Sequence, residues 1–202
     1  MKILAIDPGN MQSAFVILEH KTLEITKKGL IPNEEMLILF KGDNTYFGCQ
    51  PFDAACIEYP KARGQLVSNQ LMDAIYWIGR FDQACAQEMI RIDRKDVKMT
   101  LCGVANAKDS NIRAALIAKY THLVKGKGGR IPEIGCAGCE GPLYNVKKDI
   151  WAALGVAFTY METLGKKSML GFGEKECPTG GYLRKSSKSY SKRYDRVEDM
   201  KK

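Results

Sequence analysis

The sequence predicts a mixed α/β fold, in which helices pack on the faces of one β-sheet. The order of its elements predicts this class, because strand-like segments come first and strands and helices then alternate. The length agrees with it, since 202 residues with a hydrophobic fraction of 45% can form one well-buried domain. Hydrophobic periodicity and turn residues define each element in order.

The N-terminal part of the chain predicts three strands in a meander and then a helix. Residues 3–6 are a short apolar run that ends in Asp7, and a Pro-Gly pair terminates it. Residues 13–18 form the second predicted strand and residues 22–30 the third. Residues 34–40 have the pattern of a helix.

The middle of the chain predicts a strand and then a long helix. Apolar residues 54–57 end in Glu58, just as the first strand ends in Asp7. After a polar loop, Ser68 or Asn69 is expected to cap a helix that runs to residue 87 or so, with apolar positions at 3–4 spacing.

The remaining elements continue the alternation. Residues 89–92 predict a short strand, parallel to the earlier ones because a helix crossover precedes it. Helices are expected over residues 95–101, 110–120 and 148–164. Residues 124–142 are rich in Gly and Lys and predict a loop.

The net charge of +8 is concentrated near the C-terminus. Residues 183–202 carry eight basic and three acidic residues and almost no aliphatic ones. This composition is typical of flexible segments that attract polyanions, and a purely solubilising tail would have the same composition. We therefore expect a folded domain over residues 1–166 and a basic, flexible tail over residues 167–202.

The sequence contains seven cysteines, an odd number, and shows no secretory signal. No apolar stretch has the length of about 18 residues that spans a membrane. We expect reduced thiols and a cytoplasmic protein without a signal peptide or transmembrane segment. Cys136 and Cys139 have metal-ligand spacing, but a structural Zn²⁺ site needs four ligands. Two free thiols are the preferred interpretation, and a site completed by Cys102 or Cys177 together with His122 or a partner subunit is the alternative.

Asp7 and Glu58 both lie at the end of an apolar strand. Two carboxylates brought close together raise each other's pKa unless a cation lies between them. Divalent metal ions commonly supply that charge, since Mg²⁺ is bound by one or two carboxylates together with substrate phosphates. The pattern indicates a metal-dependent enzyme of phosphate chemistry.

A third acid, Asp149, opens the last predicted helix, where alone it would only complement the helix dipole. In the order strand-end Asp7, strand-end Glu58 and helix Asp149, the chain resembles the RuvC-type Holliday junction resolvases of the RNase H-like superfamily. The resemblance extends over residues 1–164. It includes residues 94–109, which are similar to the family's Gly loop and DNA-contacting lysine, and a Gly-Pro-Leu-Tyr segment similar to small phage-encoded members.

The resemblance implies an RNase H-like mixed five-stranded sheet flanked by helices and the activity of a crossover junction endodeoxyribonuclease. Such an enzyme hydrolyses phosphodiesters of Holliday junctions and other branched DNA to 5′-phosphate and 3′-hydroxyl ends, in the host cytoplasm if phage-encoded. It implies two Mg²⁺ ions per site, which Mn²⁺ can replace, and no nucleotide cofactor. Asp7, Glu58 and Asp149 are then the metal ligands and catalytic residues, with Asp7 between the ions.

The chain departs from the family pattern in the last helix, where the family places two metal-site residues one turn apart. If Asp149 is the first of these, Ala152 occupies the second position; if it is the second, Val146 occupies the first. Asp109 is a candidate fourth acid. Alternatively, it is the N-cap of the helix that begins at Ser110, since Asp is a preferred cap.

The resemblance also implies DNA contacts and a homodimer, which matches the two-fold symmetry of a four-way junction. Lys108 is the expected catalytic or phosphate-contacting lysine, and an ordinary solvated lysine is the alternative. Residues 68–87 are the expected dimer interface, unless the rings of that helix belong to the core of the monomer. The expected interface rings are Tyr76, Trp77 and Phe81. Tyr59 is expected to contact DNA or, alternatively, to pack on the domain. The further expected DNA-binding residues are Lys61, Arg63, Lys98 and Arg113.

Two other functions stay open. The chain could be a catalytically degenerate DNA-binding or scaffold protein of the same fold, which the missing acid at Ala152 would fit. It could also be a fragment of an actin-like or heat-shock-type ATPase, since these also place Asp and Gly after a first strand. Those ATPases are longer and repeat their subdomain, and this sequence contains no such repeat.

Overall fold

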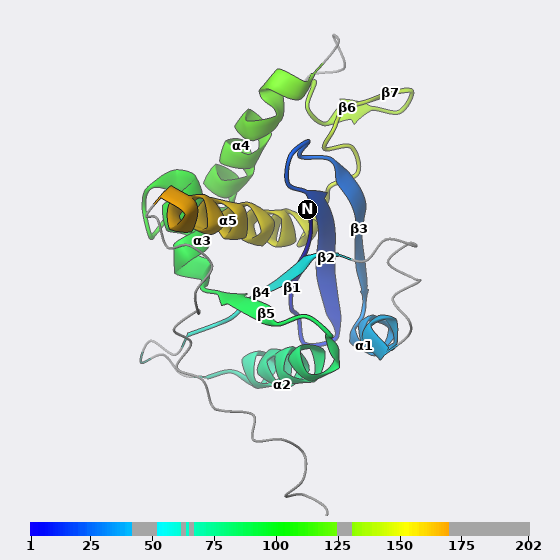
Figure 1. The fold of residues 1–202 in the computed structure, drawn as a ribbon, viewed down its shortest axis with the longest axis vertical. Coiled ribbons are helices and arrows are strands. Elements are labelled where there is room, and N and C mark those ends of the chain that lie inside the picture. The colour runs from blue at the N-terminus through cyan, green and yellow to red at the C-terminus, as the bar shows by residue number, and fades with distance from the viewer. Residues whose placement is uncertain (42–51, 62–63, 65–66, 125–130, 170–202) are drawn as a thin grey trace, which may run out of the picture. The chain divides into compact units, whose positions relative to one another are not determined.

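The computed structural model of the chain describes residues 1–41, 52–61, 64, 67–124 and 131–169 (Figure 1). Residues Met1–Lys167 form one compact unit. The second unit, Ser168–Lys202, lies almost wholly outside the described residues, and so does the predicted basic tail. No helix in the described ranges is long and apolar enough to cross a lipid bilayer.

Five strands form one mixed sheet, as the sequence predicts. Their order across the sheet is β3 (Ile25–Pro32), β2 (Gln12–Glu19), β1 (Lys2–Asp7), β4 (Ala54–Glu58) and β5 (Met89–Ile92). β2 pairs antiparallel with both β1 and β3, whereas β1, β4 and β5 run parallel. The predicted meander and the helix crossover before β5 are therefore confirmed.

The third strand begins at Ile25, later than the predicted residue 22. The segment before it is a turn closed by two hydrogen bonds of 2.9 Å, from the N–H of Leu23 to the carbonyl of Glu19 and from the N–H of Glu19 to the carbonyl of Glu24. Leu23 adopts a positive φ of 58° in this turn. Hydrophobic periodicity does not reveal a Leu in this conformation, and the predicted start is wrong for that reason.

Side chains alternate between the two faces of the sheet and so build two cores. Ala5 of β1 and Cys56 of β4 belong to the core on one face, whereas Ile6 and Ile57 belong to the core on the other. The first core is completed by α3 (Arg94–Cys102), α4 (Asp109–Tyr120) and α5 (Ile150–Met169), and the second by α1 (Asn33–Lys41) and α2 (Asn69–Ala84) (Figure 1).

The helix caps agree with the prediction at α2 and differ from it at α4. The hydroxyl of Ser68 accepts a 3.2 Å hydrogen bond from the N–H of Leu71, so Ser68 is the predicted N-cap. Helix α4 begins at Asp109 and its N-cap is Lys108, which makes no side-chain capping bond. The prediction that Asp109 caps this helix is therefore wrong. Its carboxylate is bound to an arginine instead.

The segment predicted as a loop contains a short hairpin, β6 (Gly135–Cys136) and β7 (Cys139–Glu140), preceded by a 3₁₀ turn at Thr121–Leu123. Cys136 pairs with Cys139 across the hairpin, and both are exposed, free thiols. Gly138 supplies the positive φ of 84° that the turn needs. Whether the pair binds zinc stays a prediction, and Cys177 of the zinc alternative lies outside the described residues.

Candidate active site

Asp7 and Glu58 emerge from the sheet on the same face and at the same edge. Ile6 is paired with Ile57 in the parallel β1–β4 register, so the next residue of each strand leaves the sheet beside the other. Alternation directs both carboxylates toward α5, because residues two positions earlier in each strand pack in the core that α5 completes. Two acids thus meet where the parallel strands end.

Asp149 completes this group from the other side. It immediately precedes α5, and its carbonyl accepts hydrogen bonds from the N–H groups of Ala152 and Ala153, which is the bonding of an N-cap. Asp149 itself is exposed. The three predicted acids share a cavity of about 290 Å³ with six other residues. They are Arg94, Asp109, Ile112, Lys148, Trp151 and Ala152.

The carboxylate of Asp7 lies in an electrostatically unfavourable place. Burial raises the pKa of Asp7 to about 8, with Glu58 as the next largest cause. Arg94 opposes this shift without cancelling it, and Asp149 and Asp109 add to it. No described residue donates a side-chain or backbone hydrogen bond to the carboxylate of Asp7 or forms an ion pair with it. A half-buried acid without a partner is therefore the centre of the group.

Arg94 joins two of the acids. Its Nη1 lies 2.9 Å from Oε2 of Glu58, and its Nη2 lies 2.6 Å from Oδ1 of Asp109. Burial raises the pKa of Glu58, and the neighbouring guanidinium counteracts that shift. Sequence reasoning missed this residue, although it is the first residue of α3 and follows shortly after β5, the third parallel strand. The signal that could have identified Arg94 is a basic residue placed just after a parallel strand, at the edge of the sheet where Asp7 and Glu58 lie.

The chemistry of the cavity suits a divalent cation, since carboxylate oxygens are the ligands that Mg²⁺ prefers. Asp7, Glu58 and Asp149 supply such oxygens, and Asp7 lacks a compensating charge. Within the described ranges, however, no three Asp, Glu, His or Cys side chains lie close enough together to hold a metal ion. A metal ion that binds Glu58 would also have to compete with the guanidinium of Arg94.

Neither position considered for a fourth family ligand carries an acid. Ala152 lines the acidic cavity, and Val146 is buried in the core. Asp109 does line the cavity, but its side chain is 79% exposed and bound to Arg94. It therefore lies within reach of the site as one partner of an ion pair.

The other predicted site residues lie in different surroundings. Lys108 is exposed at the start of α4 and does not line the acidic cavity. Lys61 lies 3.7 Å from Asp93, and Lys98 is half-buried on α3. Tyr59 packs against the core of the α2 face, with the guanidinium carbon of Arg91 5.0 Å from its ring centroid, as the packing alternative expects. Arg63 lies outside the described residues, and Arg113 lies on α4 against Trp151.

A buried polar clamp holds the turn that follows Asp7. The hydroxyl of Ser13 donates a 2.6 Å hydrogen bond to Oδ1 of Asn33, and Nδ2 of Asn33 donates to the carbonyl of Gly9 at 3.0 Å. The N–H of Gly9 donates to Ser13 at 3.3 Å. A Cβ on Gly9 would lie 2.2 Å from the carbonyl oxygen of Gln12, so the turn requires glycine. The clamp fixes the chain next to Asp7, and the sequence alone did not indicate it.

The rings of α2 divide between core and surface. Phe81 is fully buried, as the core alternative expects, and Trp77 is half-buried. Tyr76 is 61% exposed and Met72 is 59% exposed on the same helix.

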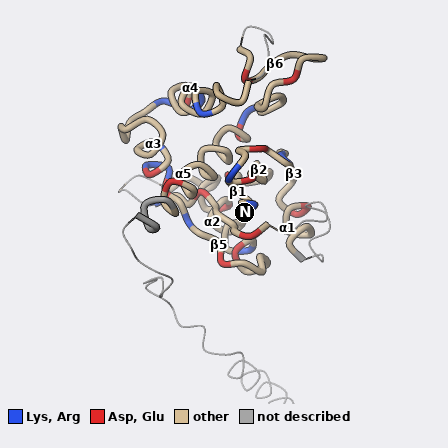
Figure 2. The backbone as a smooth tube through the Cα atoms, turned by 45° about the horizontal axis from the view of Figure 1, so that its top comes forward, with Lys and Arg blue, Asp and Glu red and all other residues tan. Residues whose placement is uncertain are grey.

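Basic and acidic residues are interspersed along the described backbone (Figure 2).

Comparisons with known proteins identify the fold. No protein-family model and no characterised protein sequence matches the chain. The solved structure of Thermus thermophilus RuvC matches with a TM-score of 0.53 at 11% identity, covering 85% of this chain and 97% of that one. T. thermophilus RuvC in complex with a Holliday junction substrate matches with the same score and identity, covering 82% of this chain and 96% of that one. The fowlpox virus Holliday junction resolvase matches at 15% identity with a TM-score of 0.37, covering 81% and 99%.

The mixed five-stranded sheet and its flanking helices thus form a RuvC-like fold of the RNase H type, as the resemblance implied. At this identity the likeness concerns the fold.

Proposed function

We propose that the protein is a structure-selective, metal-dependent endonuclease that resolves Holliday junctions and other branched DNA. The products are a 5′-phosphate and a 3′-hydroxyl. The observation that carries the proposal is the convergence of Asp7, Glu58 and Asp149 on one cavity, with Asp7 half-buried, unpartnered and raised in pKa. The RuvC-like fold supports it, because the complex of T. thermophilus RuvC holds such a substrate.

Asp7, Glu58 and Asp149 are the residues that would hold Mg²⁺, or Mn²⁺ in its place. When bound, a pair of such ions supplies an activated water and a stabilised leaving oxygen for phosphodiester hydrolysis. The chain's own contribution is to hold Asp7 at the end of a central strand, where partial burial disfavours its charged form. Arg94 keeps Glu58 oriented toward the cavity through a 2.9 Å hydrogen bond.

A homodimer is part of the proposal, because two sites related by a two-fold axis match a four-way junction. The exposed Met72 and Tyr76 of α2 support this interface, since Met and Tyr are enriched at protein interfaces. Lys61, Lys98 and Lys108 are proposed to contact DNA phosphates.

The experiment is cleavage of four-way junction, flap and plain duplex DNA with Mg²⁺ and without it, using the full chain and its Asp7→Asn variant. The wild type is expected to cut branched substrates only with Mg²⁺. Asp7→Asn should remove cleavage and leave DNA binding equal or stronger, because a charge that repels phosphate is lost. Junction cleavage by Asp7→Asn would refute the assignment.

A second function has specific support, namely a catalytically inactive DNA-binding or scaffold protein. Ala152 lines the cavity where the family pattern has an acid, and Arg94 already neutralises Glu58 and Asp109. This alternative predicts tight binding of branched DNA with no Mg²⁺-dependent cleavage in the same assay.

A further inference from the structure

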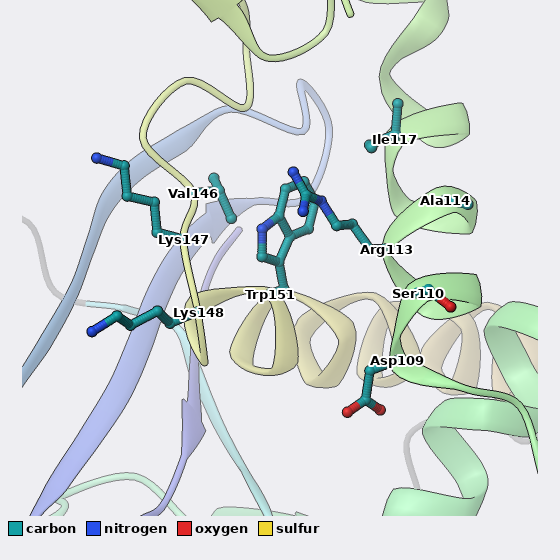
Figure 3. A pocket seen from close by; sticks show the side chains of 9 residues that line it. All are labelled: Asp109, Ser110, Arg113, Ala114, Ile117, Val146, Lys147, Lys148 and Trp151. Carbon is teal, nitrogen blue, oxygen red and sulfur yellow. The ribbon is translucent and has the colours of Figure 1, made fainter.

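A second cavity of about 580 Å³ adjoins the acidic one. It lies between α4 and the start of α5, and it shares Asp109, Lys148 and Trp151 with the acidic cavity (Figure 3). Apolar side chains such as Ile117 and Val146 form much of its lining. Three of its four charged residues are basic, namely Arg113, Lys147 and Lys148, and the fourth is Asp109.

Arg113 differs from the other arginines that the structure describes. Arg80, Arg91 and Arg94 each form an ion pair with a carboxylate. Arg113 forms none with any described residue, although Asp109 lies one helical turn away, because Asp109 is bound to Arg94. The guanidinium carbon of Arg113 instead lies 4.9 Å from the ring centroid of Trp151. Its donors are therefore available to a ligand.

Trp151 gives this arginine a fixed support. Trp151 is only 9% exposed, and its indole rises from the first turn of α5 beside Arg113, which comes from α4 and is exposed (Figure 3). An arginine whose guanidinium is held against an indole has lost much of its freedom before any ligand arrives. Planar guanidinium groups stack on nucleobases, and unpaired bases are those that can be reached.

We propose that this cavity binds an unpaired nucleotide of a DNA strand, with its base stacked on the Arg113–Trp151 pair and its phosphate near Lys147 and Lys148. The inference rests on the proposed function and deepens it, because a nucleotide held here adjoins the cavity that Asp7 and Glu58 line. Bases of an intact duplex are already stacked on each other, whereas branched DNA can present an unpaired base. The site therefore favours branched substrates over duplex.

The test uses Trp151 as its own reporter. The chain contains two tryptophans, so Trp77→Phe leaves Trp151 as the only one, and its fluorescence is excited selectively over that of the nine tyrosines. In EDTA, where no metal is available for cleavage, this protein is titrated with a ten-nucleotide oligothymidylate and with a fully paired DNA hairpin. Arg113→Lys is compared with Lys119→Gln in the same background. The first keeps the charge and removes the planar group, and the second removes a charge on the same helix that is paired with Glu162, away from the cavity.

The single strand is expected to quench Trp151 fluorescence. Arg113→Lys should weaken single-strand binding by about fivefold or more. The same variant should change hairpin binding by less than about twofold, because the phosphate-attracting charge is retained. Lys119→Gln should match the parent protein on both ligands. Absence of quenching, or an equal effect of Arg113→Lys on both ligands, would overturn the inference.

The two proposals fail in different ways. If the wild type cuts four-way junctions with Mg²⁺ while Arg113→Lys binds single strand like the parent, the nuclease proposal stands and the nucleotide site is refuted. If the single-strand preference depends on Arg113 but no branched DNA is cut, the nuclease proposal fails and the cavity remains a nucleotide-binding site.

Discussion

Nη1 of Arg94 lies 2.9 Å from Oε2 of Glu58, so one of the acids in the candidate site is bound to an arginine of the same chain. The pair is largely buried, with side-chain exposures of 29% and 17%. A guanidinium in this position lowers the repulsion among the acids of a metal-free protein. A metal ion that binds Glu58 must compete with it.

Arg94→Gln is therefore expected to destabilise the metal-free protein and to increase its response to Mg²⁺. Loss of the charged hydrogen bond to Glu58 should lower the free energy of unfolding by about 2 kcal/mol. Thermal melts in EDTA and in Mg²⁺ measure both effects. Arg91→Gln is the control, because it removes a more exposed pair with Asp82 and should cost less than about 1 kcal/mol. A variant that melts like the wild type in both buffers would show that Arg94 does not balance the acids.

Ser13→Ala is expected to loosen the turn that holds Asp7. It leaves Oδ1 of the buried Asn33 without its donor and the N–H of Gly9 without its acceptor, which should cost about 1–3 kcal/mol in urea unfolding. Because the clamp acts on the chain next to Asp7, cleavage should also fall at temperatures where the variant is fully folded. Thr22→Ala is the control, since its hydroxyl accepts only an exposed 3.4 Å bond. Normal cleavage by the folded Ser13→Ala variant would show that the clamp contributes to stability and does not position Asp7 for cleavage.

The fold and the proximity of Asp7 and Glu58 could be predicted because each depends on local patterns. Strands β1 and β4 are buried on both faces, so they occur as short apolar runs, and each ends in its acid. Parallel pairing of such strands brings their ends together without further information.

The contacts of Arg94 and Asp109 could not be predicted, because they join residues from three elements whose spacing only the packed structure fixes. Asp109 has the sequence context of a cap, and the nearby guanidinium outweighs that local preference. The support of Arg113 by Trp151 likewise depends on how α4 packs against α5. Tertiary contacts thus decided the roles of these residues.

Tyr76→Lys is expected to convert the proposed homodimer into a monomer. Tyr76 is 61% exposed, so a lysine fits at this position without disturbing the core, but it would introduce a charge into the interface. If the Tyr76 ring lies at the centre of the interface, the dissociation constant of the dimer should rise by about 30-fold or more. Sedimentation of wild type and variant measures this. Met99→Lys on α3, where the methionine is 45% exposed, is the control and should leave the association unchanged. A monomeric wild type would refute the proposed interface.

Asp7→Asn is expected to change how stability depends on pH. The folded protein raises the pKa of Asp7 from 3.8, the value of an unperturbed aspartate, to about 8, so between these values the folded state holds a proton that the unfolded state releases. The free energy of unfolding of the metal-free wild type should therefore fall as pH rises from about 4 to about 8. Asparagine has no proton to lose, and the variant should become more stable than the wild type by a margin that grows with pH. Urea unfolding in EDTA at several pH values measures the margin, with Asp73→Asn on the exposed face of α2 as the control. Saturating Mg²⁺ should flatten the wild-type curve, because a bound cation favours the ionised carboxylate. Parallel curves for wild type and Asp7→Asn would contradict the half-buried, unpartnered state of this acid.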